Sequence, residues 1–325
     1  MTQMSTGRMH AGELDISAPL VQRLLAAQFP QWADLPLTPV RSAGTDNALY
    51  RLGADMVVRL PRIHWAVGQA EKEHRWLPHL APHLPLAIPL PLALGEPDAD
   101  YPWHWAVHRW LEGENAAAEQ VADPRQAALD LARFIAALQR IDATGWPPPR
   151  PDDSYRGEPL IRRDAPTRAA ITALRDVIDM DAATAVWEAA MAAPPWSGPP
   201  VWLHGDLQAG NLLAVQGRLS AVIDFGCLGV GDPAGDVMAA WLYLGADTRD
   251  LFRAVLQVDD ATWARGRGWA LSVGLIALPY YRDTNPVLAG IARRAIDEAL
   301  EGYALDTPSG KNRFPLSRIA GQTIM

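Results

Sequence analysis

The pattern of hydrophobic and polar positions divides the chain into a strand-rich first part and a helical second part. Two short, mostly apolar runs, from Ala48 to Leu52 and from Met56 to Leu60, flank a turn at residues 53–55, and this pattern is typical of two β-strands joined by a turn. An aromatic-rich run from Tyr101 to Trp110 predicts a further strand. Near residue 112 the strand-like runs give way to alanine and leucine at helical spacing.

Apolar residues at a spacing of 3.6 predict helices along most of the chain. The predicted helices cover residues 14–29, 69–80, 124–141, 167–178, 182–193, 233–244, 263–278 and 287–303. We therefore expect an α+β protein with an N-terminal extension and helix at 1–32, a strand-rich lobe at 33–111, a helical lobe at 112–306 and a tail at 307–325. Residues 30–39 are expected to form an irregular connector.

The composition narrows the classes of function without identifying one. A chain of 325 residues with 49% hydrophobic and 20% charged residues can form two lobes with substantial cores. The net charge of −8 argues against a nucleic-acid partner, which usually meets a basic face. We expect neither a membrane span nor a secretory signal. The single cysteine, Cys227, excludes an intramolecular disulfide and suits a reducing, cytoplasmic location.

Three polar side chains stand out in the apolar stretch at residues 201–226. Asp206 and Asn211 share one loop, and Asp224 follows a β-type run further along. Carboxylate and amide oxygens are the ligands that Mg²⁺ prefers, and Mg²⁺ takes few of them from the protein because it keeps several waters. A second carboxylate nearby can receive the proton of an attacking hydroxyl. This combination is typical of phosphoryl transfer from a nucleotide.

The residues between Asp206, Asn211 and Asp224 predict how the chain brings these three side chains together. The apolar run at 201–203 ends at Asp206 and its neighbours, and Gly217 marks a hairpin-like turn after Asn211. The second strand of the hairpin then delivers Asp224 at its end. A surface turn with an N-capping Asp, next to an unrelated buried strand, is the alternative. It explains each half of the motif but not their order and spacing.

The motif His-Gly-Asp-x-x-x-x-Asn at residues 204–211, followed by Ile-Asp-Phe-Gly at 223–226, resembles the signatures of the aminoglycoside phosphotransferase family, whose fold is similar to that of protein kinases. The resemblance extends over residues 38–300 and implies a two-lobed kinase-like fold, with a strand-rich N-lobe and a helical C-lobe. It implies that Asp206 is the catalytic base, that Asn211 and Asp224 bind the metal, and that His204 supports the catalytic loop.

A loop of small residues at 42–47 lies between two predicted strands and includes Gly44, Thr45 and Asn47. Backbone N–H groups in such a loop can approach phosphate oxygens, because small side chains leave them accessible. We therefore expect this loop to cover the nucleotide phosphates. It holds one glycine rather than three, so an ordinary hairpin turn is the alternative.

The resemblance places the cation for the nucleotide phosphates at Arg59, where protein kinases carry Lys. Arg can bind phosphate with two N–H groups, although the geometry of Lys does not transfer to it. Arg62 is a less favoured candidate, and a surface cation is the alternative reading of Arg59. Glu73 takes the place of the helix Glu that pairs with this cation, in preference to Glu71. A solvated charge is the alternative for Glu73.

Two further parts of the site follow from the resemblance alone. Backbone groups near Arg109, Trp110 and Leu111 would meet the adenine, although aromatic residues there also suit a buried strand.

The acceptor would bind among the C-terminal helices, where Asp236, Tyr280, Tyr281 and Asp283 are candidate contacts. The resemblance also implies that Asp236 supports the catalytic loop, and a plain helix-surface charge is the alternative. For the other three, a role within their own loop is the alternative.

We therefore expect an enzyme that uses ATP, or GTP, with Mg²⁺ to phosphorylate a hydroxyl of a small, cationic acceptor. An aminoglycoside-like antibiotic is the first candidate, which would make the protein a resistance enzyme. A macrolide, choline, a sugar or another amino-alcohol fits the same residues. A nucleotide-binding protein that has lost transfer is the other alternative; the intact Asp206, Asn211 and Asp224 argue against it, and Arg59 argues mildly for it.

Overall fold

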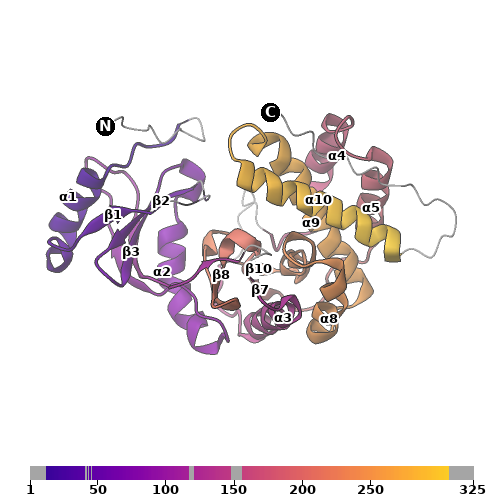
Figure 1. The fold of residues 1–325 in the computed structure, drawn as a ribbon, viewed down its shortest axis with the longest axis horizontal. Helices are drawn as coiled ribbons and strands as arrows, with labels where there is room; N and C mark the ends of the chain where they lie inside the picture. Colours follow the sequence, from indigo (N-terminus) through magenta and orange to yellow (C-terminus); the bar gives the residue numbers. More distant parts are fainter. Residues whose placement is uncertain are drawn as a thin grey trace.

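The computed structural model describes residues 12–40, 42, 44, 46–116, 121–147 and 156–306. Figure 1 shows two lobes, a strand-rich N-lobe in indigo to purple and a helical C-lobe in magenta to yellow. The two-lobed α+β architecture predicted from the sequence is therefore confirmed. The expected tail at 307–325, the first residues of the N-terminal extension and Thr45 lie outside the described residues.

The N-lobe is built on an antiparallel five-stranded sheet in the order β1-β2-β3-β5-β4. Its strands are β1 (Leu37–Pro39), β2 (Asn47–Leu52), β3 (Met56–Pro61), β4 (Pro91–Gly95) and β5 (Trp105–Arg109). Buried and half-buried residues alternate along β2 and β3, because one face of each strand points into the core. The predicted hairpin of residues 48–60 is thus confirmed, and the aromatic strand is shorter than predicted.

The connector at residues 30–39 is not irregular, as was expected. It contains a 3-10 turn at Pro30–Trp32 and the strand β1, which pairs antiparallel with β2 from Leu37↔Leu52 to Pro39↔Tyr50. The expectation was wrong because this strand is only three residues long and forms through pairing with its neighbour. A period-two pattern needs a longer run to be visible in sequence.

Helix α1 (Ala18–Gln28) belongs to the N-lobe rather than to a separate extension. Ser17 begins it, since its Oγ accepts a hydrogen bond from the Leu20 N–H and a proline follows in the first turn. Leu20 and Leu24 share one hydrophobic core with Leu52 and Val58 of the sheet. Figure 1 shows α1 on the outer side of the sheet and α2 on the inner side.

Helix α2 (Gln69–Leu80) has the bounds predicted from the sequence and connects the two lobes. Its Leu77 and Leu80 pack into the core of the C-lobe. Next to them, Trp76 forms an aromatic cluster with Trp146 and Trp202 of the C-lobe, with ring centroids 5.0 to 5.4 Å apart. Edge-to-face contacts of this kind are favourable beyond the area that they bury, so α2 is held firmly against the C-lobe.

The C-lobe is a set of helices around two small sheets. Its helices are α3 (Pro124–Arg140), α4 (Asp164–Ala173), α5 (Met180–Ala192), α6 (Ala234–Val237), α7 (Ala239–Leu242), α8 (Ala246–Leu256), α9 (Asp260–Tyr281) and α10 (Pro286–Asp306). Strand β7 (Val201–Leu203) pairs with β10 (Gly229–Gly231), and the other sheet has the order β6 (Glu114–Asn115), β8 (Leu212–Val215) and β9 (Arg218–Val222). These strands lie where the lobes meet (Figure 1). The motif residues lie in the segments that follow β7 and β9.

Most predicted helices of the C-lobe match the structure to within a few residues. The prediction at 167–178 is displaced, since α4 begins at Asp164 and ends at Ala173. The single helix predicted at 233–244 is wrong, because the structure divides it into α6 and α7. Asp232 does accept the Ala234 N–H as a cap. The segment beyond it is buried throughout, so packing on all sides overrides its local helix propensity.

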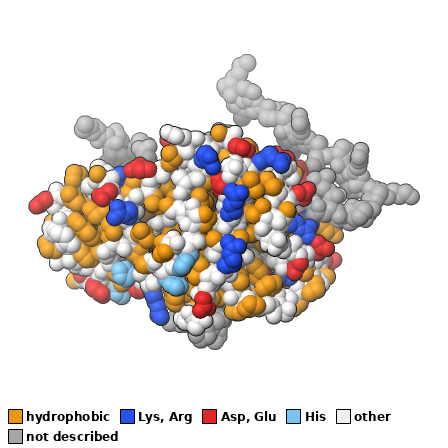
Figure 2. Space-filling view, turned by 90° about the horizontal axis from the view of Figure 1, so that it is seen from below, with side chains coloured by type: hydrophobic (Ala, Val, Ile, Leu, Met, Phe, Trp, Pro, Cys, Tyr) orange, Lys and Arg blue, Asp and Glu red, His pale blue; other side chains and the backbone are white. Residues whose placement is uncertain are grey.

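The face shown in Figure 2 mixes hydrophobic, acidic and basic side chains, and a group of Lys and Arg side chains lies along its middle. Positive charge is therefore concentrated locally, although the net charge of the chain is −8. Within the described ranges, no helix is both long enough and apolar enough to cross a lipid bilayer.

A buried histidine in the N-lobe predicts how stability depends on pH. His108, on β5, is 2% exposed, and burial lowers its pKa to about 3, with Arg59 and His74 adding to the effect. On unfolding its pKa returns to about 6.5, so the unfolded state binds the proton more tightly between these values. The contribution of neutral His108 to stability is therefore complete above pH 6.5 and is lost as the pH falls toward 3.

We expect the stability advantage of the wild-type protein over His108→Gln to shrink by an amount on the order of a few kcal/mol between pH 7 and pH 4. Urea unfolding at several pH values measures this difference. The variant His83→Gln, which changes an exposed histidine, serves as the matched control. A difference for His108→Gln that stays constant over this range would contradict the burial of a neutral imidazole.

Candidate active site

The loop after β7 holds Asp206 and Asn211 as one unit. The Asn211 side-chain Nδ2 donates to the carbonyl oxygen of Asp206 and to its Oδ2, both at 2.8 Å. Burial raises the pKa of Asp206 to about 6, and the nearby charges of Arg156 and Asp224 act in opposite directions on it, Arg156 lowering it and Asp224 raising it. The Asp206 carboxylate is thus oriented by the chain and carries a proton affinity suited to a base that works near neutral pH.

Asp236 and His204 hold the backbone of this loop. Asp236 accepts the N–H of His204 at 2.8 Å and that of Gly205 at 2.7 Å, one on each carboxylate oxygen. His204 accepts the Asp206 N–H on Nδ1 at 3.2 Å and donates from Nε2 to the Ile223 carbonyl at 3.0 Å. Burial lowers the pKa of His204 to about 4, so the imidazole is neutral. His204 supports the loop rather than taking part in the chemistry.

The same contacts correct one expectation about Asp236. It was a candidate for contact with the acceptor, but it is fully buried in α6 and both its oxygens face the loop. Burial raises the pKa of Asp236 to about 7, while the two backbone donors lower it. The alternative reading, in which Asp236 supports the catalytic loop, is the one that fits its contacts.

Asp224 reaches the site through a tight hairpin. Strands β8 and β9 turn at Gln216 and Gly217, both with positive φ (52° and 74°), as a two-residue hairpin requires. The Ile223 N–H then bonds to the Asn211 carbonyl at 2.8 Å, which joins the two halves of the motif. Asp224 itself has a φ of 63°, a left-handed conformation that Asp tolerates better than most residues. The predicted meeting of loop and hairpin therefore occurs.

Arg59 connects three elements at this point. Its guanidinium lies 3.2 Å from Glu73 on α2 and 2.6 Å from Asp224, and it is largely buried. Burial by itself would lower the pKa of Arg59, but the charges of Glu73 and Asp224 raise it overall. The same ion pair lowers the pKa of Asp224 despite burial. Glu73, rather than Glu71, is thus the partner of Arg59, because Glu71 pairs with His104 at 2.8 Å instead.

Arg62 does not share this position. Its guanidinium faces Glu13 at 3.9 Å, and its backbone bonds to Leu14 and Asp46, so it belongs to the contact with the N-terminal segment. Asn47, by contrast, points its side-chain amide at Arg59, with two guanidinium nitrogens 3.2 Å away. Asn47 is therefore part of the Arg59 cluster.

The residues of the lid and hinge are placed less favourably than expected. The Gly44 N–H donates to Ser42 Oγ at 2.9 Å, and Thr45 lies outside the described residues. The N–H groups of Arg109 and Trp110 bond to the Leu90 and Asp55 carbonyls at 2.9 and 2.7 Å.

These two hinge donors are thus used within the N-lobe. For Leu111, no bond of its N–H or C=O to another described residue is found. Among the three predicted hinge residues, Leu111 has the backbone groups that can still pair with a base. The roles of the lid and hinge stay predictions.

The oxygen atoms near Asp224 suit Mg²⁺. Asn211 uses its amide nitrogen for Asp206, and its Oδ1 accepts no hydrogen bond from any described residue. Asp224 uses Oδ1 for Arg59 and for the Gly226 N–H, and within the described residues its Oδ2 makes no bond. One amide and one carboxylate oxygen fit a Mg²⁺ that also binds phosphates and water. A group of three or more His, Cys, Asp or Glu side chains able to hold a metal does not occur in the described part of the chain.

The candidate acceptor residues lie at the C-terminal end of α9. Tyr280 and Tyr281 contact each other edge to face with ring centroids 4.9 Å apart, and Tyr280 is half exposed. Asp283 is exposed and lies 3.6 Å from its neighbour Arg282. Their contact with an acceptor stays a prediction.

Comparison with known proteins decides the family. The phosphotransferase enzyme family matches residues 37–269, which is more than half of the chain. The chain belongs to this family. The resemblance drawn from the motif at 204–226 is thereby confirmed, and so is the prediction of a phosphotransferase at the level of the family.

Several individual proteins resemble this phosphotransferase. Aminoglycoside 3'-phosphotransferase from Escherichia coli is 37% identical over 83 residues, which cover 23% of this chain and 31% of that relative. The structure of the GDP and kanamycin complex of APH(2")-IIia has a TM-score of 0.65 at 18% identity, covering 88% of this chain and 99% of that one. Macrolide 2'-phosphotransferase MphH from Brachybacterium faecium has a TM-score of 0.54 at 22% identity, covering 86% and 97%. Both likenesses in structure confirm the fold.

One cation of this phosphotransferase was missed from the sequence. Lys72, next to Glu73 on α2, donates from Nζ to the carbonyls of Gly226 and Leu228 at 2.5 and 3.2 Å. Burial lowers the pKa of Lys72. It ties α2 to the segment after Asp224 and so helps to place that carboxylate. In the sequence Lys72 stands among alternating charges, and nothing there distinguishes it from a solvated residue.

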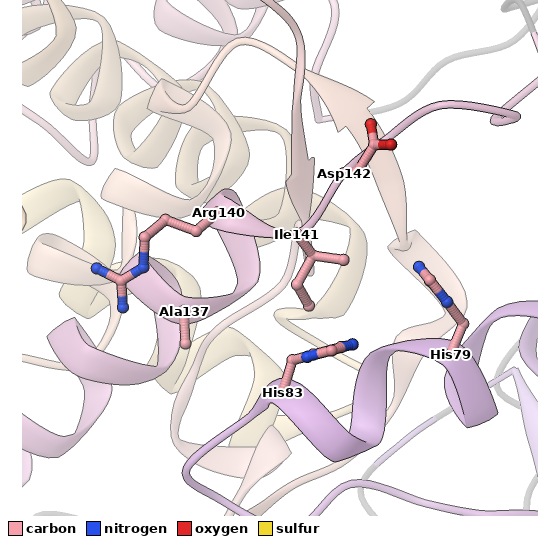
Figure 3. Close-up of a pocket in the computed structure, with 6 residues that line it drawn as sticks. All are labelled: His79, His83, Ala137, Arg140, Ile141 and Asp142. Carbon is pink, nitrogen blue, oxygen red and sulfur yellow. The ribbon is translucent and has the colours of Figure 1, made fainter.

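A hollow of about 420 Å³ lies away from the catalytic loop. It is lined by His79, His83, Ala137, Arg140, Ile141 and Asp142. Figure 3 shows the Arg140 guanidinium and the Asp142 carboxylate directed away from the two imidazoles, and Asp142 accepts from the N–H and the hydroxyl of Thr144 at 2.9 and 2.7 Å. Because its polar groups do not converge, this hollow lacks the features of a reaction site.

The variant Asp236→Asn tests the support of the catalytic loop. An amide nitrogen would face a backbone N–H in place of an accepting oxygen, leaving a buried donor without a partner. We expect the free energy of unfolding to fall by about 1–3 kcal/mol and turnover to fall because Asp206 is displaced. Thermal and urea unfolding measure the first effect. Asp250→Asn, on the exposed side of α8, is the control; equal stability of both variants would exclude this role of Asp236.

Proposed function

We propose that this protein transfers the γ-phosphoryl group of ATP to a hydroxyl of a small molecule. The observation that carries the proposal is the arrangement of Asp206, Asn211 and Asp224. Asn211 is hydrogen-bonded to Asp206 at 2.8 Å, the hairpin brings Asp224 to the same loop, and the charge of Asp224 acts to raise the pKa of Asp206. Phosphoryl transfer needs a proton acceptor beside a metal-binding pair, and this geometry supplies both.

The reaction assigns a separate task to each residue. Asp206 receives the proton of the acceptor hydroxyl. The oxygen of that hydroxyl forms a bond to the γ-phosphorus, and the bond from the γ-phosphorus to the β-phosphate oxygen breaks, which releases ADP. Asn211 and Asp224 would hold Mg²⁺, which neutralises charge on the phosphate oxygens. Arg59 keeps Asp224 in place and adds positive charge near the phosphates. Because no covalent enzyme intermediate is involved, the rate depends on placement and charge.

The acceptor proposed first is an aminoglycoside. The relatives described above include an aminoglycoside 3'-phosphotransferase and a protein solved with kanamycin, and aminoglycosides offer many hydroxyls. A macrolide is the second candidate, since a macrolide 2'-phosphotransferase shares the fold over most of this chain. The nucleotide is ATP in this proposal, and GTP is the alternative, because GDP occupies the relative that carries kanamycin.

A panel of acceptors tests the function and the acceptor together. Purified protein is incubated with labelled ATP, Mg²⁺ and each of kanamycin, a macrolide, choline and a sugar, and both ADP and labelled acceptor are measured. We expect label on kanamycin. Label only on another acceptor would replace the aminoglycoside, and repetition with GTP compares the nucleotides. Binding of ATP without ADP release for any acceptor would point to a nucleotide-binding protein that has lost transfer.

Asp206→Asn separates catalysis from binding. The amide keeps the size and hydrogen bonding of the side chain but does not accept a proton. We expect turnover to fall by about 10²-fold or more, while affinity for Mg-ATP, measured by calorimetry, stays close to that of the wild type. Unchanged turnover would remove Asp206 from the mechanism.

Asp224→Ala tests the metal site. Loss of one of the two proposed ligands should weaken nucleotide binding in the presence of Mg²⁺ by about tenfold or more, and affinity without Mg²⁺ should change much less. Titrations with ADP, with and without Mg²⁺, measure both values. If wild-type protein binds ADP equally well with and without Mg²⁺, Asp224 is not a metal ligand. Because Asp224 also pairs with Arg59, thermal unfolding of the variant is followed in parallel.

A further inference from the structure

The cations already described near the catalytic loop are occupied by protein groups. Arg59 is held between Glu73 and Asp224, and Lys72 donates to two backbone carbonyls. Arg59 and Lys72 therefore position neighbouring segments of the protein, and these protein partners compensate part of the charge of each cation. The transferring phosphoryl group carries negative charge on three oxygens. A guanidinium near the catalytic loop that is not paired with a carboxylate would bind this group.

Arg156 lies next to the catalytic loop, and both its side chain and its backbone pack against residues that form or support this loop. A Cβ on Gly205 would lie 3.0 Å from Arg156 Cγ, so the Arg156 side chain passes directly over the residue before Asp206. A Cβ on Gly235, next to Asp236, would collide with the Arg156 carbonyl oxygen. The adjacent Gly157 carbonyl also accepts the Asp232 N–H at 3.1 Å. Arg156 is thus built into the support of the catalytic loop.

The guanidinium of Arg156 lies over the buried ring of Trp269, with its Cζ 5.9 Å from the ring centroid. Arg163 approaches the same ring at 5.5 Å. Among the described residues, no carboxylate lies within 4.0 Å of either guanidinium. Burial, followed by the charge of Arg156, lowers the pKa of Arg163 to about 10. Arg163 donates from Nε to the Ser272 hydroxyl at 3.3 Å. Arg156, held on the indole beside a second cation and without a carboxylate partner, is therefore the charge that an anion would stabilise.

Arg156 is also the positive charge that acts most strongly on the Asp206 carboxylate. An amine of a polycationic acceptor would be repelled at this position, whereas a phosphoryl group attacked by the hydroxyl beside Asp206 would be attracted. The planar guanidinium offers several N–H donors in a fork that matches phosphate oxygens. The charge balance therefore favours the phosphoryl group as the anion that meets Arg156.

We propose that Arg156 is a catalytic residue that binds the phosphoryl group during transfer and stabilises its negative charge. This inference rests on the proposed function and adds a residue to it. Arg156 donates hydrogen bonds to the phosphoryl oxygens and exchanges no proton. The proton of the acceptor still passes to Asp206, and the bonds made and broken are those described above. Arginine in this role acts on the transition state more than on bound ATP.

Aluminium fluoride tests the proposal without an identified acceptor. With Mg-ADP it imitates a phosphoryl group in transit, so wild-type protein should bind Mg-ADP more tightly when it is present. We expect Arg156→Gln to keep its affinity for Mg-ADP, measured by calorimetry, and to lose most of this gain. Arg156→Lys, which retains the charge but not the fork, should recover part of it. Arg163→Gln is the matched control, because Arg163 contacts the same ring but is not among the charges acting on Asp206.

Kinetics with the acceptor found in the panel give the second readout. We expect Arg156→Gln to lower kcat by about 10²-fold or more with little change in KM for either substrate, whereas Arg163→Gln should leave kcat within a few-fold of the wild type. Thermal unfolding separates these effects from loss of packing on Trp269, which both variants share.

Three outcomes would overturn the inference alone and leave the proposed function standing. If aluminium fluoride raises the affinity for Mg-ADP equally in the wild type and in Arg156→Gln, Arg156 does not contact the phosphoryl group. The same conclusion follows if the wild type binds Mg-ADP but its affinity does not rise with aluminium fluoride. A rise confined to KM of the acceptor would assign Arg156 to acceptor binding instead. Failure of the wild type to bind Mg-ADP at all is a distinct result, which would overturn the proposed function and this inference with it.

Discussion

The ion pairs of Arg59 hold the candidate site together. Arg59 comes from the third strand of the sheet, Glu73 from α2 and Asp224 from the end of the β8–β9 hairpin, and the guanidinium contacts both carboxylates within 3.2 Å. The Glu73 side chain is 1% exposed, so removing either partner of the Arg59–Glu73 pair would leave an uncompensated buried charge, at a cost of about 3–5 kcal/mol. The sheet, α2 and the hairpin are therefore fixed relative to one another by one side chain, and the metal-binding carboxylate is placed by the same contact.

The pKa values of the carboxylates around Arg59 depend on a balance between burial, which raises them, and nearby positive charge, which lowers them. Asp206 and Asp236 both have raised pKa values because burial disfavours their charged forms. Asp224 has a lowered one because Arg59 outweighs the same effect. The carboxylates of one small region are thereby given different proton affinities, one suited to accepting a proton and another suited to binding a cation. Separation of this kind between neighbouring carboxylates is a common feature of acid–base sites.

Lys72 and Arg156 belong to the same balance but were not visible in the sequence. Lys72 faces the segment after Asp224 because α2 packs against the C-lobe through Leu77 and the cluster around Trp76. Arg156 reaches Gly205 from a segment nearly fifty residues upstream. In sequence both are ordinary charged residues, and their positions follow only from how distant segments of the chain pack together. The same applies to Asp236, whose buried contacts with the loop distinguish it from a helix-surface charge.

The sequence by itself determined the two-lobed plan, the bounds of α2, the β2–β3 hairpin and the meeting of Asp206, Asn211 and Asp224. These depend on local periodicity, on turn residues and on short spacings, which act within a few residues along the chain. The tertiary structure alone decided the strand β1, the division of α6 from α7 and the use of the Arg109 and Trp110 donors inside the N-lobe. Each of these depends on which distant groups meet, and pairing and burial between distant segments override local propensity.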